Sequence, residues 1–299
     1  MFLSRNRTLR HFAENNALGR RVSGRFVAGT TSDEAIETVA ALRAEGLYTT
    51  IDRLGETVLT SEAALAAMRA YCQMLDALAA RGLEPNVSVK LSQMGIEFDP
   101  QLAERIMTEL VMHATRMEGF VRVDMEDIRF TEATIAMTER LNARFGSGLV
   151  GTVIQAYLYR SEADVKRLID RGIRIRLCKG AYLESAAVAF PRKAEVDENY
   201  FKLAVMMLRS GIYHGFASHD EALIERIANF AQEQQIGRSA FEFQMLYGVR
   251  RDLQNSLTRR GFRIRIYVPF GNEWFPYFMR RLAERPANLL FLAKNLLRT

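Results

Sequence analysis

Residues 161–182 read SEADVKRLIDRGIRIRLCKGAY, and this one stretch contains a complete structural unit of the chain. A helical pattern ends at Gly172, and glycine enters the left-handed conformation at a helix C-terminus without a Cβ clash. A short run of Ile and Leu follows and ends in the polar residues Arg176 and Lys179. The stretch therefore predicts a helix, a tight turn and a strand with a polar end.

The same unit recurs along the chain. Helical segments end at eight glycines, which are Gly46, Gly82, Gly119, Gly146, Gly172, Gly211, Gly237 and Gly261. The strands after them are predicted to begin near Tyr48, Val87, Val121, Val150, Ile173, Gly215, Phe241 and Arg263. Alternation of strands with helical patterns indicates a parallel sheet with helical crossovers. Eight strands favour an α/β protein of the closed (βα)8 TIM-barrel type over an open sheet.

Two parts of the chain are expected. Residues 1–46 are predicted to form an N-terminal arm and a helix, from Ser32 to Glu45, that pack on the barrel. Residues 47–299 are predicted to form the barrel itself. After the eighth strand we expect a helix from Asn272 to Arg285, because Pro286 disfavours its continuation. No linker divides the sequence.

Composition indicates an ordered globular protein, with 48% hydrophobic and 25% charged residues and only six prolines. The apolar stretch from Leu289 to Ala293 is cut by Lys294, far short of the roughly 20 residues that span a bilayer. Cys72 and Cys178 each lie in an apolar segment, and the N-terminus lacks a signal-peptide pattern. We therefore expect a reduced, cytoplasmic protein without a transmembrane segment.

The net charge of +6 is concentrated at the N-terminus. Residues 1–30 contain six arginines and one acid, Glu14, so they account for +5 of the total. Such an arm can contact RNA, an anionic membrane or acidic residues of its own domain. An arm folded against the barrel is the favoured interpretation of the three.

Polar residues gather where the predicted strands end. In a barrel of this type the catalytic face lies at the C-terminal ends of the strands. Any single residue there can serve a structural ion pair, but a whole ring of them indicates a site. The ring consists of Lys90, Ser92, Asp124, Glu126, Asp127, Gln155, Arg176, Lys179, Gly180, Ser218, His219, Asp220, Gln244 and Tyr267.

The segment RLCKGAY, residues 176–182, has the features of a phosphate site. Backbone N–H groups of a Gly-Ala turn and the side chain of Lys179 could receive a phosphate there. Alone the signal is weak, since glycine turns with a lysine are common. The sequence lacks the GxGxxG and Walker A patterns, so a nucleotide cofactor would be bound by the barrel itself.

The predicted helix after the eighth strand has two faces. Its apolar side contains Phe275, Phe278, Met279 and Leu282. The helical period places five other residues together, namely Tyr277, Arg280, Arg281, Glu284 and Asn288. The pattern alone leaves two interpretations, a solvated face with ordinary ion pairs and a guanidinium clamp for a carboxylate.

Six segments in this order resemble proline dehydrogenase. They are VSVKLSQMG (87–95), VRVDMED (121–127), RLCKGAY (176–182), FEFQMLYG (241–248), RIYVPFG (265–271) and WFPYFMRRLAERPAN (274–288). The resemblance extends from residue 24 to residue 288. It implies a distorted (βα)8 barrel with noncovalent FAD at the C-terminal face and a final helix across the barrel mouth.

The same resemblance implies a reaction and its partners. L-proline would be oxidised to Δ1-pyrroline-5-carboxylate by hydride transfer from C5 to flavin N5, the first step of proline catabolism to glutamate. Electrons would pass to a membrane quinone, and a separate pyrroline-5-carboxylate dehydrogenase would take the product. Nucleic acid and metal have no role in this expectation. Peripheral contact with the inner face of the cytoplasmic membrane is compatible with a quinone acceptor.

Site residues are carried over by motif. Asp124 and Arg176 resemble catalytic residues, with Arg176 beside the flavin N5. The residues that resemble substrate-binding positions are Lys90, Tyr182, Tyr267, Arg280, Arg281 and Glu284. Those that resemble FAD-binding positions are Met125, Gln155, Arg176, Lys179, Gly180, Ala181, Ser218, His219 and Gln244. Cys178 and Asp220 depart from the residues that the family more often has. Tyr267 predicts a preference for L-proline over 4-hydroxyproline.

Two other classes of function are compatible with parts of the sequence. A flavin-free barrel lyase or aldolase would use Lys90 or Lys179 as a Schiff base. An RNA-binding protein would use the basic arm, although no aromatic cluster lies between the arginines of that arm.

Overall fold

Eight parallel strands pair with their neighbours in chain order, and the last returns to the first to close a barrel. This computed structural model describes residues 24–55 and 57–283, the last four of them by backbone alone. The strands are β1 (Tyr48–Arg53), β2 (Asn86–Val89), β3 (Phe120–Val123), β4 (Val150–Gln155), β5 (Ile175–Cys178), β6 (His214–Ala217), β7 (Phe241–Leu246) and β8 (Arg263–Phe270). The predicted (βα)8 barrel is confirmed, and each strand begins within two residues of its expected start.

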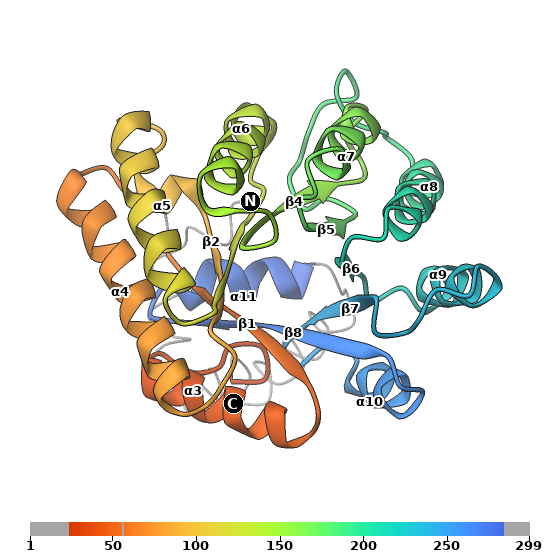
Figure 1. Ribbon diagram of the computed structural model, residues 1–299, viewed down its shortest axis with the longest axis horizontal. Helices are drawn as coiled ribbons and strands as arrows, with labels where there is room; N and C mark the ends of the chain where they lie inside the picture. The colour runs from red at the N-terminus through yellow and green to blue at the C-terminus, as the bar shows by residue number, and fades with distance from the viewer. Residues whose placement is uncertain (1–23, 56, 284–299) are drawn as a thin grey trace, which may run out of the picture.

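Helices surround the barrel, as the view down its axis shows (Figure 1). They are α3 (Ser32–Ala44), α4 (Ser61–Ala80), α5 (Pro100–Thr115), α6 (Ile128–Phe145), α7 (Ser161–Ile169), α8 (Lys193–Arg209), α9 (Glu221–Glu233) and α10 (Arg251–Arg259). Another helix, α11 (Trp274–Ala283), is placed differently. A 3-10 turn, η2 (Leu91–Met94), follows β2. The predicted helix from Ser32 is α3, which packs against β1 and β8. A domain boundary at residue 46 stays a prediction.

Glycine ends most of the helices as expected. Six of the eight predicted glycines have positive φ angles, for example 80° at Gly46 and 68° at Gly172. At the other two junctions Glu118 and Gln235 take the left-handed conformation instead. Gly119 has a different reason to be glycine, since a Cβ there would lie 2.9 Å from the carbonyl oxygen of Pro85.

The strands alternate between apolar and polar residues. Val121 and Val123 of β3, for example, join the apolar core between the barrel and its helices. Arg122 and Asp124 alternate with them in sequence, and both are buried. In β7, Phe241 and Phe243 belong to the outer core, while Glu242 and Gln244 are buried polar residues. The barrel interior is therefore lined by hydrogen-bonding and charged groups, unlike the Val- and Leu-filled interior usual for this fold.

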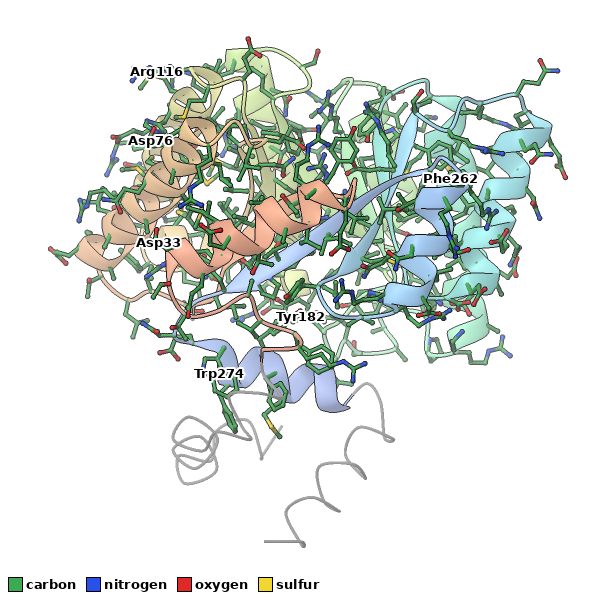
Figure 2. The ribbon with its side chains drawn as sticks, turned by 90° about the horizontal axis from the view of Figure 1, so that it is seen from below. Asp33, Asp76, Arg116, Tyr182, Phe262 and Trp274 are labelled. Carbon is green, nitrogen blue, oxygen red and sulfur yellow. The ribbon has the colours of Figure 1, made fainter. Side chains whose placement is uncertain are left out.

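Helix α11 lies across one end of the barrel. It projects onto the ring of strands in Figure 1, and the perpendicular view of Figure 2 shows it beyond the strands, on the same side as Tyr182. Trp274, Phe275 and Phe278 pack with Phe26 and Leu54 in a small apolar cluster. The expected helix across the barrel mouth is confirmed.

One residue of α11 differs from the predicted pattern. Tyr277, expected on the arginine face, is buried in this same cluster, with 6% of its surface exposed. Phe26 and Val27, from the segment before α3, belong to the same cluster and add apolar surface that the helical period of α11 alone does not reveal.

The described end of the basic arm is fixed in place. Gly248 has a φ of +73°, and a Cβ there would lie 1.6 Å from the carbonyl oxygen of Arg25. The guanidinium of Arg25 lies 5.5 Å from the ring centre of Phe26. The close approach of the Arg25 backbone to Gly248 favours an arm that is folded against the barrel at residue 25. The arginines at positions 5, 7, 10, 20 and 21 lie outside the described residues.

Two sequence expectations concern membranes and thiols. None of the helices within residues 24–55 and 57–283 has the length and apolar character needed to cross a membrane. Cys72 and Cys178 are free thiols.

Candidate active site

Arg176 stands at the centre of the polar barrel interior. Its Nη1 donates to Asp124 Oδ1 at 2.8 Å, its Nη2 to Ser88 Oγ at 3.0 Å and its Nε to Gln244 Oε1 at 2.5 Å. The guanidinium also lies 5.1 Å from the ring centre of Tyr267. These partners come from β2, β7, β8 and the residue that follows β3. All three guanidinium nitrogens are therefore fixed by groups that converge across the barrel.

Lys90 and Tyr267 extend this arrangement. Lys90 Nζ lies 2.7 Å from Asp52 Oδ1, 3.7 Å from Asp124 Oδ2 and 3.4 Å from the Tyr267 hydroxyl. That hydroxyl donates to Asp124 Oδ2 at 2.7 Å. We call these residues, with Arg176, the inner cluster: Asp52, Lys90, Asp124, Arg176 and Tyr267. Two cations, two carboxylates and a phenol thus meet in one buried volume.

The inner cluster sets the protonation of two of its members. Burial alone would lower the pKa of Lys90, but the charges of Asp52 and Asp124 outweigh it and raise the pKa. Burial, and then the charge of Asp124, raise the pKa of Tyr267, so its phenol stays protonated. A Schiff-base lysine needs a lowered pKa, so Lys90 is unsuited to the lyase alternative.

A second polar group lies beside the inner cluster. Glu126 accepts hydrogen bonds from the backbone N–H of Ser92 at 3.0 Å and from its hydroxyl at 2.5 Å. Gln155 Nε2 donates to the Glu126 carbonyl at 3.3 Å. Gln155 is only 3% exposed, and its Oε1 has no hydrogen-bond partner among the described residues. A buried acceptor of this kind matches an N–H donor supplied by a ligand.

Lys179, three residues beyond Arg176, has a different setting. Its Nζ lies 2.5 Å from Asp197 and 2.8 Å from Asp220, and Lys193 also pairs with both acids. We call Lys179, Lys193, Asp197 and Asp220 the rim cluster. A hydrogen bond from Lys179 lowers the pKa of Asp220, so this carboxyl stays ionised. The predicted phosphate-binding lysine is thus held by two acids, and a phosphate would have to replace them.

The remaining predicted cofactor residues line the same end of the barrel. His219 Nε2 accepts the backbone N–H of Leu246 at 2.9 Å, and Ser218 Oγ accepts that of Asp220 at 3.1 Å. Gly180 has a φ of +123°, and a Cβ there would lie 2.3 Å from the ring of Tyr157. Met125 is buried, whereas Ala181 and Tyr182 are exposed. The structure therefore brings these residues to one mouth.

The predicted carboxylate clamp can be placed only by its backbone. Arg280 and Arg281 lie in the last turn of α11, across the mouth, but their side chains are outside the described residues. Glu284 lies outside them altogether. The clamp stays a prediction.

Sequence reasoning missed three residues of the interior. Asp52 pairs with Lys90, Ser88 binds Arg176, and Glu242 accepts hydrogen bonds from Gln244 and Arg265. The signal was present, because in VSVK, VRVD, FEFQ and RIRIY every second residue is polar or charged. Strand alternation places those residues on one face. Reading only strand ends left out the polar residues deeper in the barrel.

Known proteins resemble this chain over its whole length. The family described as "Proline dehydrogenase" matches residues 35–294. "Proline dehydrogenase 1" of Bacillus subtilis (strain 168) is 41% identical over 299 residues, which cover 100% of this chain and 98% of that protein. "Proline dehydrogenase" of Deinococcus radiodurans is 41% identical over 277 residues, 92% of this chain and 89% of that protein.

A solved structure adds a likeness in three dimensions. Proline utilization A from Bdellovibrio bacteriovorus, inactivated by N-propargylglycine, superposes with a TM-score of 0.83 at 26% identity. The match covers 88% of this chain but only 32% of that larger one.

Proposed function

The chain belongs to the proline dehydrogenase family, and from this premise we propose that it oxidises L-proline to Δ1-pyrroline-5-carboxylate with a noncovalently bound FAD. The observation that carries the proposal is the inner cluster, in which Arg176 and Lys90 face Asp124 and Tyr267 beneath α11. Such a cluster can bind a small zwitterion and receive negative charge.

The residues at the mouth fit a flavin. Gln155 Oε1 is a buried acceptor without a partner among the described residues, as a ligand N–H would require. Gly180 and Ala181 form a turn with exposed backbone, and Lys179 supplies a positive charge close to it. When bound, the flavin would supply the acceptor for the hydride that leaves proline C5. Met125, Ser218, His219 and Gln244 are the other proposed contacts.

Arg176 is proposed to stabilise the negative charge that a bound flavin would receive with the hydride. Its guanidinium is fixed by three partners, so it does not need to reorganise during the reaction. Asp124 in turn holds both Arg176 and the Tyr267 hydroxyl, one on each carboxylate oxygen. This shared carboxylate fixes the distance between the cation and the phenol ring.

The substrate carboxylate is proposed to bind to Arg280 and Arg281, with Glu284 to orient them. The position of α11 across the mouth supports this role, because it brings the backbone of both arginines to the side of the barrel where the inner cluster opens (Figure 2). A planar guanidinium matches a carboxylate with two parallel hydrogen bonds.

Electron transfer to a quinone, peripheral membrane contact and release of the product to a separate dehydrogenase complete the proposal. The resemblance to the family supports these three points.

The decisive experiment is the visible spectrum of the purified protein with and without L-proline. We expect a yellow protein whose flavin absorption bleaches anaerobically when L-proline is added. A colourless protein that neither binds added FAD nor reacts with proline would contradict the proposal. Borohydride trapping with substrate distinguishes this proposal from the lyase alternative, because borohydride reduces a lysine Schiff base to a stable covalent adduct.

A further inference from the structure

Glu242 lies in the middle of β7 and faces the barrel interior, two residues before Gln244. Its side chain is almost fully buried, with 2% of the residue exposed. Arg265 Nε donates to its Oε1 at 2.7 Å, and the Tyr213 hydroxyl donates to its Oε2 at 2.8 Å. Burial alone would raise the pKa of Glu242, but Arg265 and then Tyr213 outweigh it and keep the carboxylate ionised.

The amide of Gln244 connects this carboxylate to Arg176. Gln244 Nε2 donates to Glu242 Oε1 at 2.6 Å, and Gln244 Oε1 accepts from Arg176 Nε at 2.5 Å. An ionised carboxylate only accepts hydrogen bonds, and a guanidinium only donates them. The two neighbours therefore demand the same amide orientation. If the amide were turned by 180°, its NH2 group would face the N–H of Arg176 and its oxygen would face the carboxylate of Glu242, so both hydrogen bonds would be lost.

The strand next to β7 leaves room for that orientation. A Cβ on Gly215 of β6 would lie 2.4 Å from Gln244 Nε2 and 2.9 Å from the Gln244 amide carbon. Gly215 is paired in register with Glu242 itself. The absence of a side chain at Gly215 is thus a second, independent feature of the structure that serves the placement of the Gln244 amide.

We propose that Glu242 is a positioning residue for the reaction: its carboxylate turns the Gln244 amide so that the amide oxygen holds Arg176 toward Asp124 and Ser88. Glu242 has no contact with the inner cluster itself, so it acts only through Gln244. The inference rests on the proposed function, because it assigns Arg176 to the reacting end of the site.

The test compares Glu242→Met, which removes the acceptor, with Glu242→Gln, which keeps the shape and one acceptor but no charge. We expect the rate of flavin reduction by L-proline to fall about tenfold or more in the first and about threefold in the second. The KM for proline should stay within about twofold, since no substrate contact changes. The midpoint potential of the bound flavin, measured without proline, should fall because the Arg176 cation moves away.

Glu84→Met is the matched control. Glu84 accepts hydrogen bonds from the same Arg265 but has no contact with Gln244. Its loss should lower thermal stability and leave the flavin reduction rate and the potential unchanged. Gly215→Ala is a variant that keeps every charge, because the three atoms nearest to the added methyl all belong to the Gln244 side chain. It should reproduce the loss of rate, and it replaces Glu242→Met if that variant does not fold.

Folded Glu242 variants and Gly215→Ala that reduce flavin at the wild-type rate and potential would overturn the inference. So would an equal loss in Glu84→Met, because the role of Glu242 would then be structural. Failure of the proposed function would give a different result, because the flavin absorption of the wild-type protein would then not bleach when L-proline is added.

Discussion

The inner cluster and the rim cluster hold two cations that are close in sequence, Arg176 of β5 and Lys179 just after it, in two different ways. Arg176 is 6% exposed and makes three hydrogen bonds, to Ser88 of β2, to Gln244 of β7 and to Asp124 just after β3. Lys179 has a side chain that is 26% exposed and shares two acids with Lys193, which is 74% exposed. Because Arg176 is buried and its planar guanidinium is hydrogen-bonded at every nitrogen, it is a fixed part of the barrel. Lys179 is partly exposed to solvent, so it can exchange its partners. We therefore expect the buried cation to serve the reacting centre and the exposed one to be able to accept a ligand phosphate.

The largest expected effect comes from Arg176→Met. It leaves Asp124 without its closest cation and removes the group proposed to stabilise the charge on the flavin, a loss that costs roughly 10²- to 10³-fold in kcat. Steady-state kinetics with L-proline measure the loss. Lys179→Met is the contrast, with kcat within about threefold of the wild type once FAD is saturating. Equal losses in the two variants would remove the distinction between the clusters.

The buried side chain of His214 extends the comparison, because its titration is expected to make the stability of the protein depend on pH. His214 accepts the N–H of Ile175 at 3.0 Å, and burial, followed by the charges of Arg122 and Arg174, lowers its pKa from 6.5 to about 3. A lowered pKa contributes stability above pH 6.5 that is lost as the pH falls toward 3. We expect a loss of about 2 kcal/mol between pH 6.5 and pH 5.

Urea unfolding at several pH values measures this loss. His214→Asn, which keeps an acceptor but cannot titrate, should flatten the pH dependence. A wild-type slope that persists in His214→Asn would show that another group is responsible.

The preference for L-proline over 4-hydroxyproline tests how rigidly Tyr267 is held in the inner cluster. Its ring is fixed by the hydroxyl bond to Asp124 at 2.7 Å and by the Arg176 cation 5.1 Å from its centre. If the ring lies against substrate C4, it cannot move aside for an added hydroxyl, and kcat/KM should favour L-proline over 4-hydroxyproline by about tenfold or more. Tyr267→Ser should narrow the ratio, while Tyr267→Phe, which keeps the ring, should preserve most of it. An equal ratio in the wild type would place the ring away from C4.

The smallest effect is expected at the rim. Asp220→Asn releases Lys179 from one of its two acids, so FAD should bind about two- to fivefold more tightly at low salt. High salt should remove the gain because exposed charges are screened. Fluorescence titration of the flavin-free protein gives the affinity. Glu198→Gln removes an exposed acid that pairs with Arg226 and should change nothing.

The barrel could be predicted from the sequence because its signals are local. A glycine such as Gly172 ends a helix within its own turn, and the apolar run after it forms a strand whatever lies elsewhere. The exceptions are local too, since Glu118 and Gln235 take the left-handed conformation one and two residues before the glycine that was expected to take it.

The partners within the site were beyond the sequence. Asp52 and Lys90 are 38 residues apart, and Asp124 and Tyr267 are 143 apart. Which carboxylate meets which cation depends on the stagger of the strands, a property of the closed barrel as a whole. The two acids that hold Lys179 illustrate the point, because Asp197 lies in α8, where its sequence context suggests only a solvated helix face.

The pairing of β1 with β8 has a consequence for how the protein is made. Six residue pairs join these strands, from Tyr48 with Arg265 to Arg53 with Phe270. During synthesis the edge of β1 must therefore wait, unpaired, until more than 200 further residues have been translated, an exposure of the kind that favours aggregation of slow-folding sheets. Tyr267 arrives with the same last strand, so the nascent chain closes its barrel and completes the inner cluster in a single event.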